Sequence, residues 1–325
     1  MPLSRPANPR VNPTGESIEP AQKPGRVEQE PQAPRVSAIL VAYNQAPALR
    51  RAIEALEGSR DRDRLEILVV DCGSSDASAQ LDTDFPAVNM LRLPHHLGAA
   101  RAMNIATRTA KADLVFYLSP DVEVGPDTVT ALADRLQPDP DIHVDASETE
   151  VTAVCPLLID VDGRPVSRIH PIPTRAELSE AARGGQLPST DLDLTQESIA
   201  VAYPELDAIL IRKHFVRSMN YFDQRFGHYW ADADLAMQIR GAGKKIRLFP
   251  GIRATYHPAP DPLEGDPLAR ADRVSGAAAL VGKYEGSGAA LGFRLGAVLS
   301  ALARFDLGMV SKLTGGQKLD GSQAA

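Results

Sequence analysis

The chain has 325 residues, which is enough for one large domain or two small ones. Its 43% of hydrophobic and 24% of charged residues are typical of a protein with a full apolar core. The formal net charge of -7 argues against nucleic-acid binding, so an anionic ligand must be held by local basic groups, backbone amides or a metal ion. The two cysteines, Cys72 and Cys155, lack CxxC spacing, which argues against a disulfide framework or a zinc site and favours a reducing compartment.

The N-terminal residues 1–34 are rich in Pro, Glu, Gln and Arg and have almost no large apolar side chains. This composition predicts a disordered Pro-rich tail, which is either passive or a docking segment. The first residues hold no apolar core of a signal peptide, and no later stretch reaches the roughly 18 apolar residues that span a bilayer. These features predict a cytoplasmic protein, with a peripheral position at the inner face of the membrane as an alternative.

Ordered structure is expected from residue 36 onward, where apolar runs alternate with helical segments. The apolar runs cover residues 36–42, 67–70, 90–93 and 114–118, and the expected helices cover residues 47–56, 98–111 and 128–136. Such alternation predicts an α/β fold with a mostly parallel sheet and helices on both faces.

A polar side chain follows each of these four apolar runs. Tyr43 follows the first run, Asp71 the second, His95 and His96 the third, and Asp121 the fourth. In open parallel sheets, ligands bind outside the carboxyl ends of the strands. The sequence therefore predicts that an aromatic ring, two carboxylates and a histidine pair share one crevice.

The middle of the chain is harder to interpret. Residues 151–159 predict a further strand that breaks at Pro156. Residues 164–203 are polar without a clear period, and we interpret them as a long, partly ordered excursion of the kind that compact domains keep for binding. The elements expected after this excursion cover residues 208–211, 232–241 and 245–249, as strand, helix and strand.

The composition turns helical from residue 263 onward, and one apolar stripe recurs there. It consists of Leu291, Leu295, Val298, Leu302, Phe305 and Met309, at steps of three and four residues. This spacing places all six on one helical face. We expect that face to pack on the main domain, and the alternatives are a peripheral membrane contact or a homodimer through residues 289–313.

Five segments resemble, in order, the sequence blocks of family 2 glycosyltransferases. They are residues 36–44 (VSAILVAYN), 69–78 (VVDCGSSDAS), 118–122 (LSPDV), 222–235 (FDQRFGHYWADADL) and 240–243 (RGAG) with Pro250 and His257 after it. The resemblance covers roughly residues 36–260, and it is specific because all five blocks occur in the family's order. It implies a GT-A (nucleotide-diphospho-sugar transferase-like) domain over residues 35–260 and a C-terminal helical extension over 261–325. It also implies transfer of a sugar from a nucleotide donor with inversion.

The resemblance implies roles for several of the residues that follow the strands. Tyr43 would stack on the nucleobase of the donor, whereas a ring at a strand end can equally cap the core. Asp71 would accept a hydrogen bond from the imide N–H of a uracil or thymine, and a role in the following turn is compatible with this, with Asp76 as the expected N-cap. His96 and Arg101 are further candidates for contact with the donor, although His96 stands where the family usually has Asn.

Asp121 aligns with the last Asp of the family's DxD motif, which contacts the metal. A hard divalent ion, Mg2+ or Mn2+, takes oxygen ligands from one or two carboxylates and from substrate phosphate. His257 aligns with a histidine that supplies a further metal ligand in some relatives. Ser119 departs from the motif, because Asp or Asn is usual there. The alternatives are a plain strand-ending turn at Asp121 and a structural or exposed His257.

An inverting transfer needs one general base to take the proton of the acceptor hydroxyl. Asp232 matches the Asp of the family's Glu-Asp pair, which has that role. Asp234 lies two residues further on, so on a helix it points elsewhere and is expected to cap or pair structurally. The Glu of the pair is replaced by Ala231, which removes one carboxylate that could face the acceptor.

The sequence therefore predicts an inverting, metal-dependent glycosyltransferase that uses a UDP- or dTDP-sugar. Its acceptor would be a hydroxyl of a glycan or a lipid-linked saccharide, in keeping with a role in cell-envelope polysaccharide biosynthesis. One alternative is a catalytically weak GT-A module for binding or scaffolding, motivated by Ser119 and Ala231. Another is a sugar nucleotidyltransferase, but the Gly-rich basic loop that those enzymes carry after the first strand is absent from residues 43–47.

Overall fold

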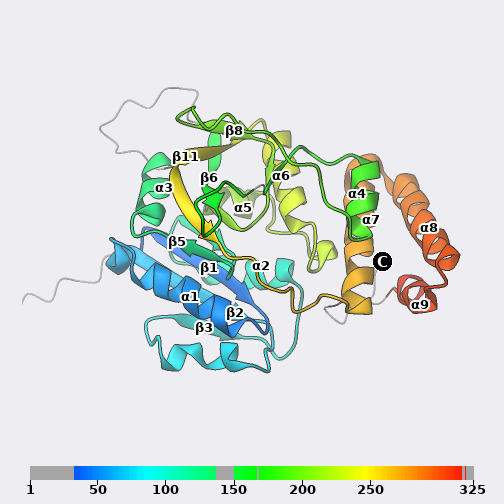
Figure 1. Ribbon diagram of the computed structural model, residues 1–325, viewed down its shortest axis with the longest axis horizontal. Helices are drawn as coiled ribbons and strands as arrows, with labels where there is room; N and C mark the ends of the chain where they lie inside the picture. The colour runs from blue at the N-terminus through cyan, green and yellow to red at the C-terminus, as the bar shows by residue number, and fades with distance from the viewer. Residues whose placement is uncertain (1–32, 137–149, 167, 317–318, 320–325) are drawn as a thin grey trace, which may run out of the picture. The chain divides into compact units, whose positions relative to one another are not determined.

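The computed structural model describes residues 33–136, 150–166, 168–316 and 319 (Figure 1). The Pro-rich tail predicted for residues 1–34 lies outside this part of the chain except for its last two residues. The strands are β1 (Val36–Ala42), β2 (Leu65–Asp71), β3 (Asn89–Arg92), β4 (Leu114–Leu118), β5 (Val122–Val124), β6 (Val151–Ile159), β7 (Ile169–His170), β8 (Ile199–Val201), β9 (Tyr203–Pro204), β10 (Ala208–Arg212) and β11 (Lys245–Tyr256). The α-helices are α1 (Ala46–Glu57), α2 (Ala99–Thr109), α3 (Thr128–Leu136), α4 (Arg175–Ala182), α5 (Lys213–Ser218), α6 (Ala231–Gly241), α7 (Pro267–Glu285), α8 (Ser287–Ala303) and α9 (Leu307–Gly315), and short 3-10 helices span Arg62–Arg64, Ala77–Thr83 and Gln224–Phe226.

Nine of these strands form one sheet in the order β3-β2-β1-β4-β10-β6-β11-β5, with β8 paired to β11. The first four strands are all parallel, as predicted from the alternation of apolar runs and helices. β10 runs antiparallel to β4, and β6 runs antiparallel to β10. The carboxyl ends of β1, β2, β3 and β4 therefore lie at one edge of the sheet, and the residues that follow these ends are neighbours.

Helices cover both faces of the sheet, which confirms the predicted fold class. Ile39 of β1 belongs to a core shared with α2, α5, α6 and α7. Its neighbour Leu40 belongs to a second core shared with α1 and α3. Successive side chains of a strand point to opposite faces, so these two residues show that each face buries its own apolar layer. In Figure 1, α1 and α3 lie on the same side of the sheet.

The predicted break at Pro156 is wrong. β6 continues from Val151–Ile159, and Pro156 pairs with Phe249 of the parallel strand β11. β10 pairs with β6 only at Ala153 and Val154, so Pro156 has a partner strand on one side only. A proline without an N–H is tolerated at such a position, because no ladder hydrogen bond is required of it.

The polar excursion over residues 164–203 forms several short elements. Its first strand, β7, pairs with β9 in a small antiparallel sheet, in which His170 lies opposite Tyr203. Between them, α4 begins with a capping box, in which the side chains of Thr174 and Glu177 satisfy the first free N–H groups of the helix. Strands of two or three residues are too short to show a hydrophobic period, so no periodic signal is visible over these residues.

The C-terminal helices α7, α8 and α9 pack on one another (Figure 1). α7 is buried along much of its length, and α8 turns Phe293 and Ala301 inward. The apolar stripe lies on the opposite face of α8, where Leu295 is 54% exposed and Phe305, just after the helix, is 88% exposed. The expectation that this stripe packs on the main domain is therefore wrong for Leu291, Leu295, Leu302 and Phe305, which are exposed, whereas Met309 is partly buried against the core. None of the helices in the described residues is long and apolar enough to cross a membrane.

Candidate active site

A pocket of about 540 Å3 opens beside the carboxyl ends of β1 and β4. We call it the strand-end pocket. Its lining includes Asp121 from the turn after β4 and Asp232 from the first turn of α6, so the fold brings together two predicted site residues that are 111 positions apart in the chain. Tyr43, Asp71, His96, Arg101 and His257 are not part of this lining, and their positions are described in turn below.

A row of aromatic and imidazole rings in contact connects Tyr43 to the wall of the strand-end pocket. The ring of Tyr43 contacts His96 edge-on at 5.0 Å between centroids, and His96 contacts His228 at the same separation. His228 then contacts Tyr229 at 4.8 Å, and the last two rings line the strand-end pocket. Burial, with the charges of neighbouring basic groups, lowers the pKa of His228 to about 3, so its ring is neutral. The row places Tyr43 and His96 next to the pocket.

Asp71 has the turn contact that the sequence predicts and keeps one oxygen without a donor. One carboxylate oxygen, Oδ2, accepts a hydrogen bond from the backbone N–H of Ser74 at 3.2 Å, as expected of a turn residue. The other oxygen, Oδ1, is buried and accepts no hydrogen bond from any described residue. Asp76 caps the following 3-10 helix by accepting from the Ser78 N–H, which confirms that prediction. A buried acceptor without a donor is costly, so Asp71 Oδ1 is suited to a ligand N–H.

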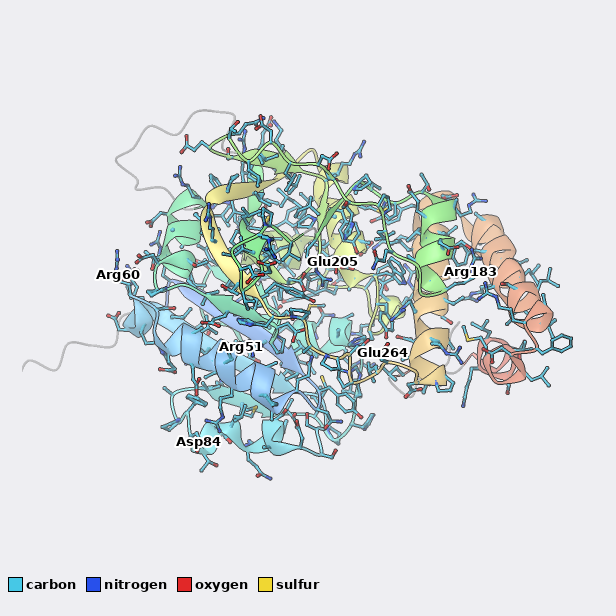
Figure 2. The ribbon with its side chains drawn as sticks, viewed as in Figure 1. Arg51, Arg60, Asp84, Arg183, Glu205 and Glu264 are labelled. Atoms are coloured by element: carbon cyan, nitrogen blue, oxygen red, sulfur yellow. The ribbon has the colours of Figure 1, made fainter. Side chains whose placement is uncertain are left out.

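Asp121 is half-buried, and it is the second carboxylate with a buried, unsatisfied oxygen. Its Oδ1 has no hydrogen-bond partner among the described residues. Burial, followed by the negative charge of Asp207, raises the pKa of Asp121 to about 6, while Arg51 on α1 (Figure 2) and Arg168 oppose this rise. Ser119, which replaces the usual acid, accepts the Asp121 N–H through its Oγ at 3.3 Å. A divalent cation at Oδ1 would satisfy this oxygen and lower the cost of its charge, so the site fits Mg2+ or Mn2+.

His257 lies beside Asp121 through the backbone, since its N–H donates to the Asp121 carbonyl oxygen at 2.8 Å. Its ring nitrogen Nε2, however, lies 2.8 Å from Oε2 of Glu123. No cluster of three or more His, Cys, Asp or Glu side chains that could hold a metal occurs among the residues described. A metal here would therefore take most of its ligands from the substrate and water, as Mg2+ commonly does.

Arg101 is directed away from the pocket. Its guanidinium donates to Oε1 of Gln224, at 3.2 Å from Nη2. The helix that carries it is nevertheless held against the site, because the Ala100 N–H donates to the Gly227 carbonyl oxygen at 3.0 Å. Gly98 is essential to this approach, since a Cβ there would lie 2.9 Å from the backbone of Gly227. The contact between α2 and Gly227 thus helps to position the wall of the site. Arg101 does not line the strand-end pocket and brings no charge to it.

Asp232 is half-buried and held by two hydrogen bonds. Its Oδ2 accepts from the phenolic hydroxyl of Tyr203, and its Oδ1 accepts from the N–H of Ala233, both at 2.8 Å. Burial, followed by the negative charge of Glu205, raises the pKa of Asp232 to about 6, although both hydrogen bonds oppose the rise. A carboxylate of this kind is ionised at neutral pH and still basic enough to accept a proton.

Asp234 has the structural role that was predicted for it. It is fully buried and forms an ion pair with Lys283 of α7, with 2.7 Å between Nζ and Oδ1. The hydroxyl of Tyr284 donates to the same oxygen at 2.8 Å. Asp234 therefore joins α6 to α7 and is turned away from the pocket that Asp232 lines.

The sequence missed a network of charged residues on the small β7–β9 sheet. Arg168 donates to Asp207 at 2.6 Å and forms an ion pair with Glu205 at 2.7 Å. His170 Nε2 lies 2.7 Å from Glu205 Oε1. Burial lowers the pKa of His170, but the contact with Glu205 raises it, and the pKa of His170 lies above its ordinary value. The close spacing of Glu205 and Asp207 before β10 was the one signal in the sequence that pointed to this network.

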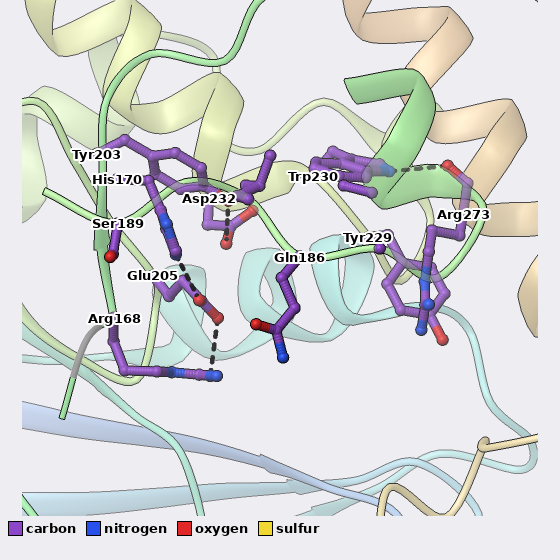
Figure 3. A pocket seen from close by; sticks show the side chains of 13 residues that line it. Arg168, His170, Gln186, Ser189, Tyr203, Glu205, Tyr229, Trp230, Asp232 and Arg273 are labelled. Atoms are coloured by element: carbon purple, nitrogen blue, oxygen red, sulfur yellow. Dashed lines mark hydrogen bonds and ion pairs between the residues drawn. The ribbon is translucent and has the colours of Figure 1, made fainter. Parts of the chain in front are cut away.

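A second pocket, of about 520 Å3, also has Asp232 in its lining (Figure 3). We call it the excursion pocket, because the segment over residues 164–203 builds most of its wall. Six residues line both pockets, namely Arg168, Glu205, Tyr229, Trp230, Asp232 and Arg273. Asp232 therefore lines two adjoining pockets, each large enough for a small-molecule ligand.

The comparisons with known proteins agree with this arrangement. Residues 37–150 match the profile of glycosyl transferase family 2. The chain is 26% identical over 242 residues to the N-acetylglucosaminyl-diphospho-decaprenol L-rhamnosyltransferase of Mycobacterium tuberculosis, covering 68% of this chain and 75% of that protein. It is also 26% identical over 221 residues to the pre-mycofactocin glycosyltransferase of Mycobacterium tuberculosis, covering 66% of this chain and 41% of that protein.

Solved structures show the same fold at low sequence identity. GalNAc-T7 with UDP, GalNAc and Mn2+ has a TM-score of 0.55 and 15% identity, covering 70% of this chain and 45% of its own. TarS 1-349 of S. aureus in complex with UDP-GlcNAc has a TM-score of 0.51 and 14% identity, covering 76% of this chain and 66% of its own. The present chain thus spans less than half of the GalNAc-T7 chain. Residues 37–150 are therefore similar to glycosyl transferase family 2, and the described residues have the GT-A glycosyltransferase fold.

Proposed function

We propose that the chain is an inverting, metal-dependent glycosyltransferase that moves a sugar from a UDP- or dTDP-sugar to a hydroxyl of a glycan or lipid-linked saccharide. One observation carries this proposal: Asp121, with its unsatisfied buried oxygen, and Asp232, with its raised pKa, line the same pocket. The first suits the charged end of a nucleotide-sugar, and the second suits a general base. A scaffold module would need neither feature.

The donor is expected to lie along the carboxyl ends of β1, β2 and β4. Tyr43 offers a ring face for the base, and the unpartnered Oδ1 of Asp71 can accept the imide N–H of uracil or thymine. Asp121 would hold Mg2+ or Mn2+ together with the donor phosphates, and when bound the metal would stabilise the leaving diphosphate. The chain has a formal net charge of -7, so a cation at Asp121 would offset the repulsion between the protein and the donor phosphates.

Asp232 would act on the acceptor. The acceptor hydroxyl oxygen attacks the anomeric carbon, its proton passes to the Asp232 carboxylate, and the bond from that carbon to the diphosphate oxygen breaks. A single displacement of this kind inverts the anomeric centre. Tyr203 holds Oδ2 of Asp232 at 2.8 Å and so fixes the orientation of the carboxylate. The names of the relatives support a saccharide acceptor, because one of them is a rhamnosyltransferase for a diphospho-decaprenol-linked sugar.

A thermal-shift scan tests the proposal. UDP or dTDP should raise the melting temperature of the chain when Mn2+ is present and much less when it is replaced by EDTA, since a ligand stabilises the state that binds it. Nucleotide-sugars that give the same shift are then tested for hydrolysis. The absence of a metal-dependent shift with every nucleotide in the scan would overturn the proposed function.

The pH dependence of transfer provides a further prediction. Asp232 must be ionised to accept a proton, and its pKa is about 6, so kcat should fall as the pH is lowered through 6. The hydroxyl of Tyr203 stabilises the ionised form, so Tyr203→Phe should raise this pKa and move the acid limb to higher pH. The measurement is a profile of kcat between pH 4.5 and 8.5 at saturating donor, acceptor and Mn2+. An acid limb that stays in place in Tyr203→Phe would show that Asp232 does not control it.

The exposed stripe on α8 gives a separate prediction, because we propose that it contacts a membrane surface or a second copy of the chain. Replacing Leu295 and Leu302 by Gln and Phe305 by Ser should change stability little, since exposed substitutions usually stay within about 0.5 kcal/mol each. The variant should lose co-sedimentation with liposomes or dissociate from dimer to monomer in light scattering.

A matched control on the same helix is Phe293→Ala. Phe293 is 9% exposed, and truncating a buried Phe costs about 3–5 kcal/mol, so this change should lower the melting temperature without altering the surface. If the wild-type chain neither sediments with liposomes nor dimerises, the stripe has neither of the two proposed partners.

A further inference from the structure

None of the residues proposed to bind the donor, Tyr43, Asp71 and Asp121, lines the excursion pocket, yet this pocket shares the candidate base with the strand-end pocket. We infer that the excursion pocket is the acceptor site, and that it takes one neutral, hydroxyl-rich saccharide ring held by Glu205, Gln186 and Ser189. The inference rests on the proposed function and deepens it, because it names the residues and the chemical class of the acceptor. The acceptor hydroxyl must lie within reach of both the base and the anomeric carbon of the donor, and Asp232 lies in the wall common to both pockets.

The walls of this pocket are held in place by contacts within the excursion. His170 bridges two segments, since Nδ1 lies 2.9 Å from the Pro188 carbonyl oxygen and Nε2 lies 2.7 Å from Glu205. These contacts fix the strand that carries Glu205 and the loop that carries Gln186 and Ser189. The pocket is therefore organised before a ligand arrives, which lowers the cost of binding.

The charges of the pocket favour a neutral ligand. Two basic groups, Arg168 and Arg273, line the pocket together with two carboxylates, Glu205 and Asp232. Arg168 is already paired with Glu205, and a strongly anionic ligand would lie against both carboxylates. A long apolar chain would leave these charged groups desolvated without partners, which is costly. Sugar hydroxyls both donate and accept, so they satisfy groups of either sign.

Unused polar groups and rings complete the match to a sugar. Figure 3 shows Gln186 pointing into the pocket, and neither its amide nor the Ser189 hydroxyl hydrogen-bonds to another side chain of the described residues. The rings of Tyr229 and Trp230 line the same space, and the Trp230 indole is fixed by donating to the Arg273 carbonyl oxygen at 2.8 Å. Rigid rings provide apolar surface for the C–H face of a sugar, while the polar groups orient its hydroxyls.

Glu205 restores a carboxylate that the chain lacks elsewhere. Ala231 stands where family 2 glycosyltransferases have the Glu that precedes the base, and it lines the strand-end pocket together with Asp232. Glu205 reaches both pockets from the end of β9, so its carboxylate is supplied by a different part of the chain. Each of its oxygens has one protein partner and can accept a second hydrogen bond, so Glu205 can still hold an acceptor hydroxyl.

The test fills the pocket with one bulky side chain. Ser189 is exposed and lines the pocket, whereas its neighbour Thr190 is exposed and does not, so Ser189→Trp and Thr190→Trp form a matched pair. The probes are the p-nitrophenyl glycosides of N-acetylglucosamine, glucose, galactose and rhamnose, with whichever nucleotide-sugar the wild-type chain hydrolyses. Ser189→Trp should raise KM for the glycoside at least about tenfold, through a steric clash, while calorimetry shows wild-type affinity for UDP or dTDP with Mn2+. Thr190→Trp should behave as wild type in both assays.

A milder variant, Gln186→Ala, should raise the same KM by roughly 2- to 10-fold, the range for one lost hydrogen bond. If no nucleotide-sugar is bound or hydrolysed, the proposed function fails. If the donor is hydrolysed but Ser189→Trp leaves KM for the glycoside unchanged, the acceptor site lies elsewhere and the inference fails. If the wild-type chain hydrolyses the donor and glycosylates none of the four glycosides, the assignment to a neutral saccharide ring is overturned.

Discussion

Asp121→Ala should abolish the Mn2+-dependent binding of UDP and dTDP while the chain stays folded. The Oδ1 of Asp121 is buried without a partner among the described residues, so it is the protein oxygen best placed for the cation that neutralises the diphosphate. Losing groups that only support a metal ligand costs about 10- to 100-fold in affinity, so losing the ligand itself should cost at least about 100-fold. Titration calorimetry with and without Mn2+ measures this effect.

The stability of the Asp121→Ala variant serves as a control for folding. The folded chain raises the pKa of Asp121 to about 6, so this group contributes stability at low pH that is lost as the pH rises through 6. At pH 7.5 the wild-type chain therefore carries an unfavourable buried charge, and the variant should melt no lower than wild type. Asp127→Ala, an exposed acid paired with Arg60, is the matched control and should bind nucleotide normally. Unchanged Mn2+-dependent affinity in Asp121→Ala would remove Asp121 from the site.

The strand-end half of the site could be predicted because it depends on local patterns. β1 and β2 are buried on both faces and form continuous apolar runs, so the residues after them, Tyr43 and Asp71, mark the strand ends. Parallel pairing then brings those ends to one edge without further information. The sequence located Asp121 for the same reason, since β4 is also fully buried.

The other half of the site could not be predicted, because it depends on pairing between distant short segments. Glu205 reaches Asp232 because β7 and β9 pair, with His170 opposite Tyr203. Two-residue strands bury too little apolar surface to produce a period, and the contacts of Arg168 arise only after that pairing. Local sequence could show that residues 164–203 were unusual, but it could not show which of their side chains lie near Asp232.

The stripe on α8 shows a different limit. A period of three and four residues identifies one face of a helix, but it does not say whether that face is turned toward the protein. Here Phe293 and Ala301 pack inward, because small residues allow α8 to approach α7 closely, and Gly282 of α7 lies near Ala290 of α8. The larger side chains, such as Leu295, lie on the exposed face of α8.

Asp232→Asn should retain donor binding yet lose transfer by about 10²- to 10⁴-fold, the usual range for removal of a general base. The amide has nearly the shape of the carboxylate and can still accept from the Ala233 N–H, but it cannot take a proton from an acceptor hydroxyl. Because burial raises the pKa of Asp232 to about 6, neutralising it removes an unfavourable charge at pH 7.5, and the melting temperature should not fall. Single-turnover transfer, calorimetry and thermal melting on one preparation measure the three effects.

Asp234→Asn, two residues along the same helix, should show the opposite pattern. It breaks the buried ion pair with Lys283, and removing one partner of such a pair costs about 3–5 kcal/mol, so its melting temperature should fall at pH 7.5. Transfer per folded molecule should change far less than in Asp232→Asn, because Asp234 lines neither pocket. Wild-type transfer by Asp232→Asn would place the base elsewhere, and a large loss in Asp234→Asn without a loss of stability would make Asp234 the next candidate. The opposite effects expected of two neighbouring carboxylates therefore separate a catalytic role from a structural one.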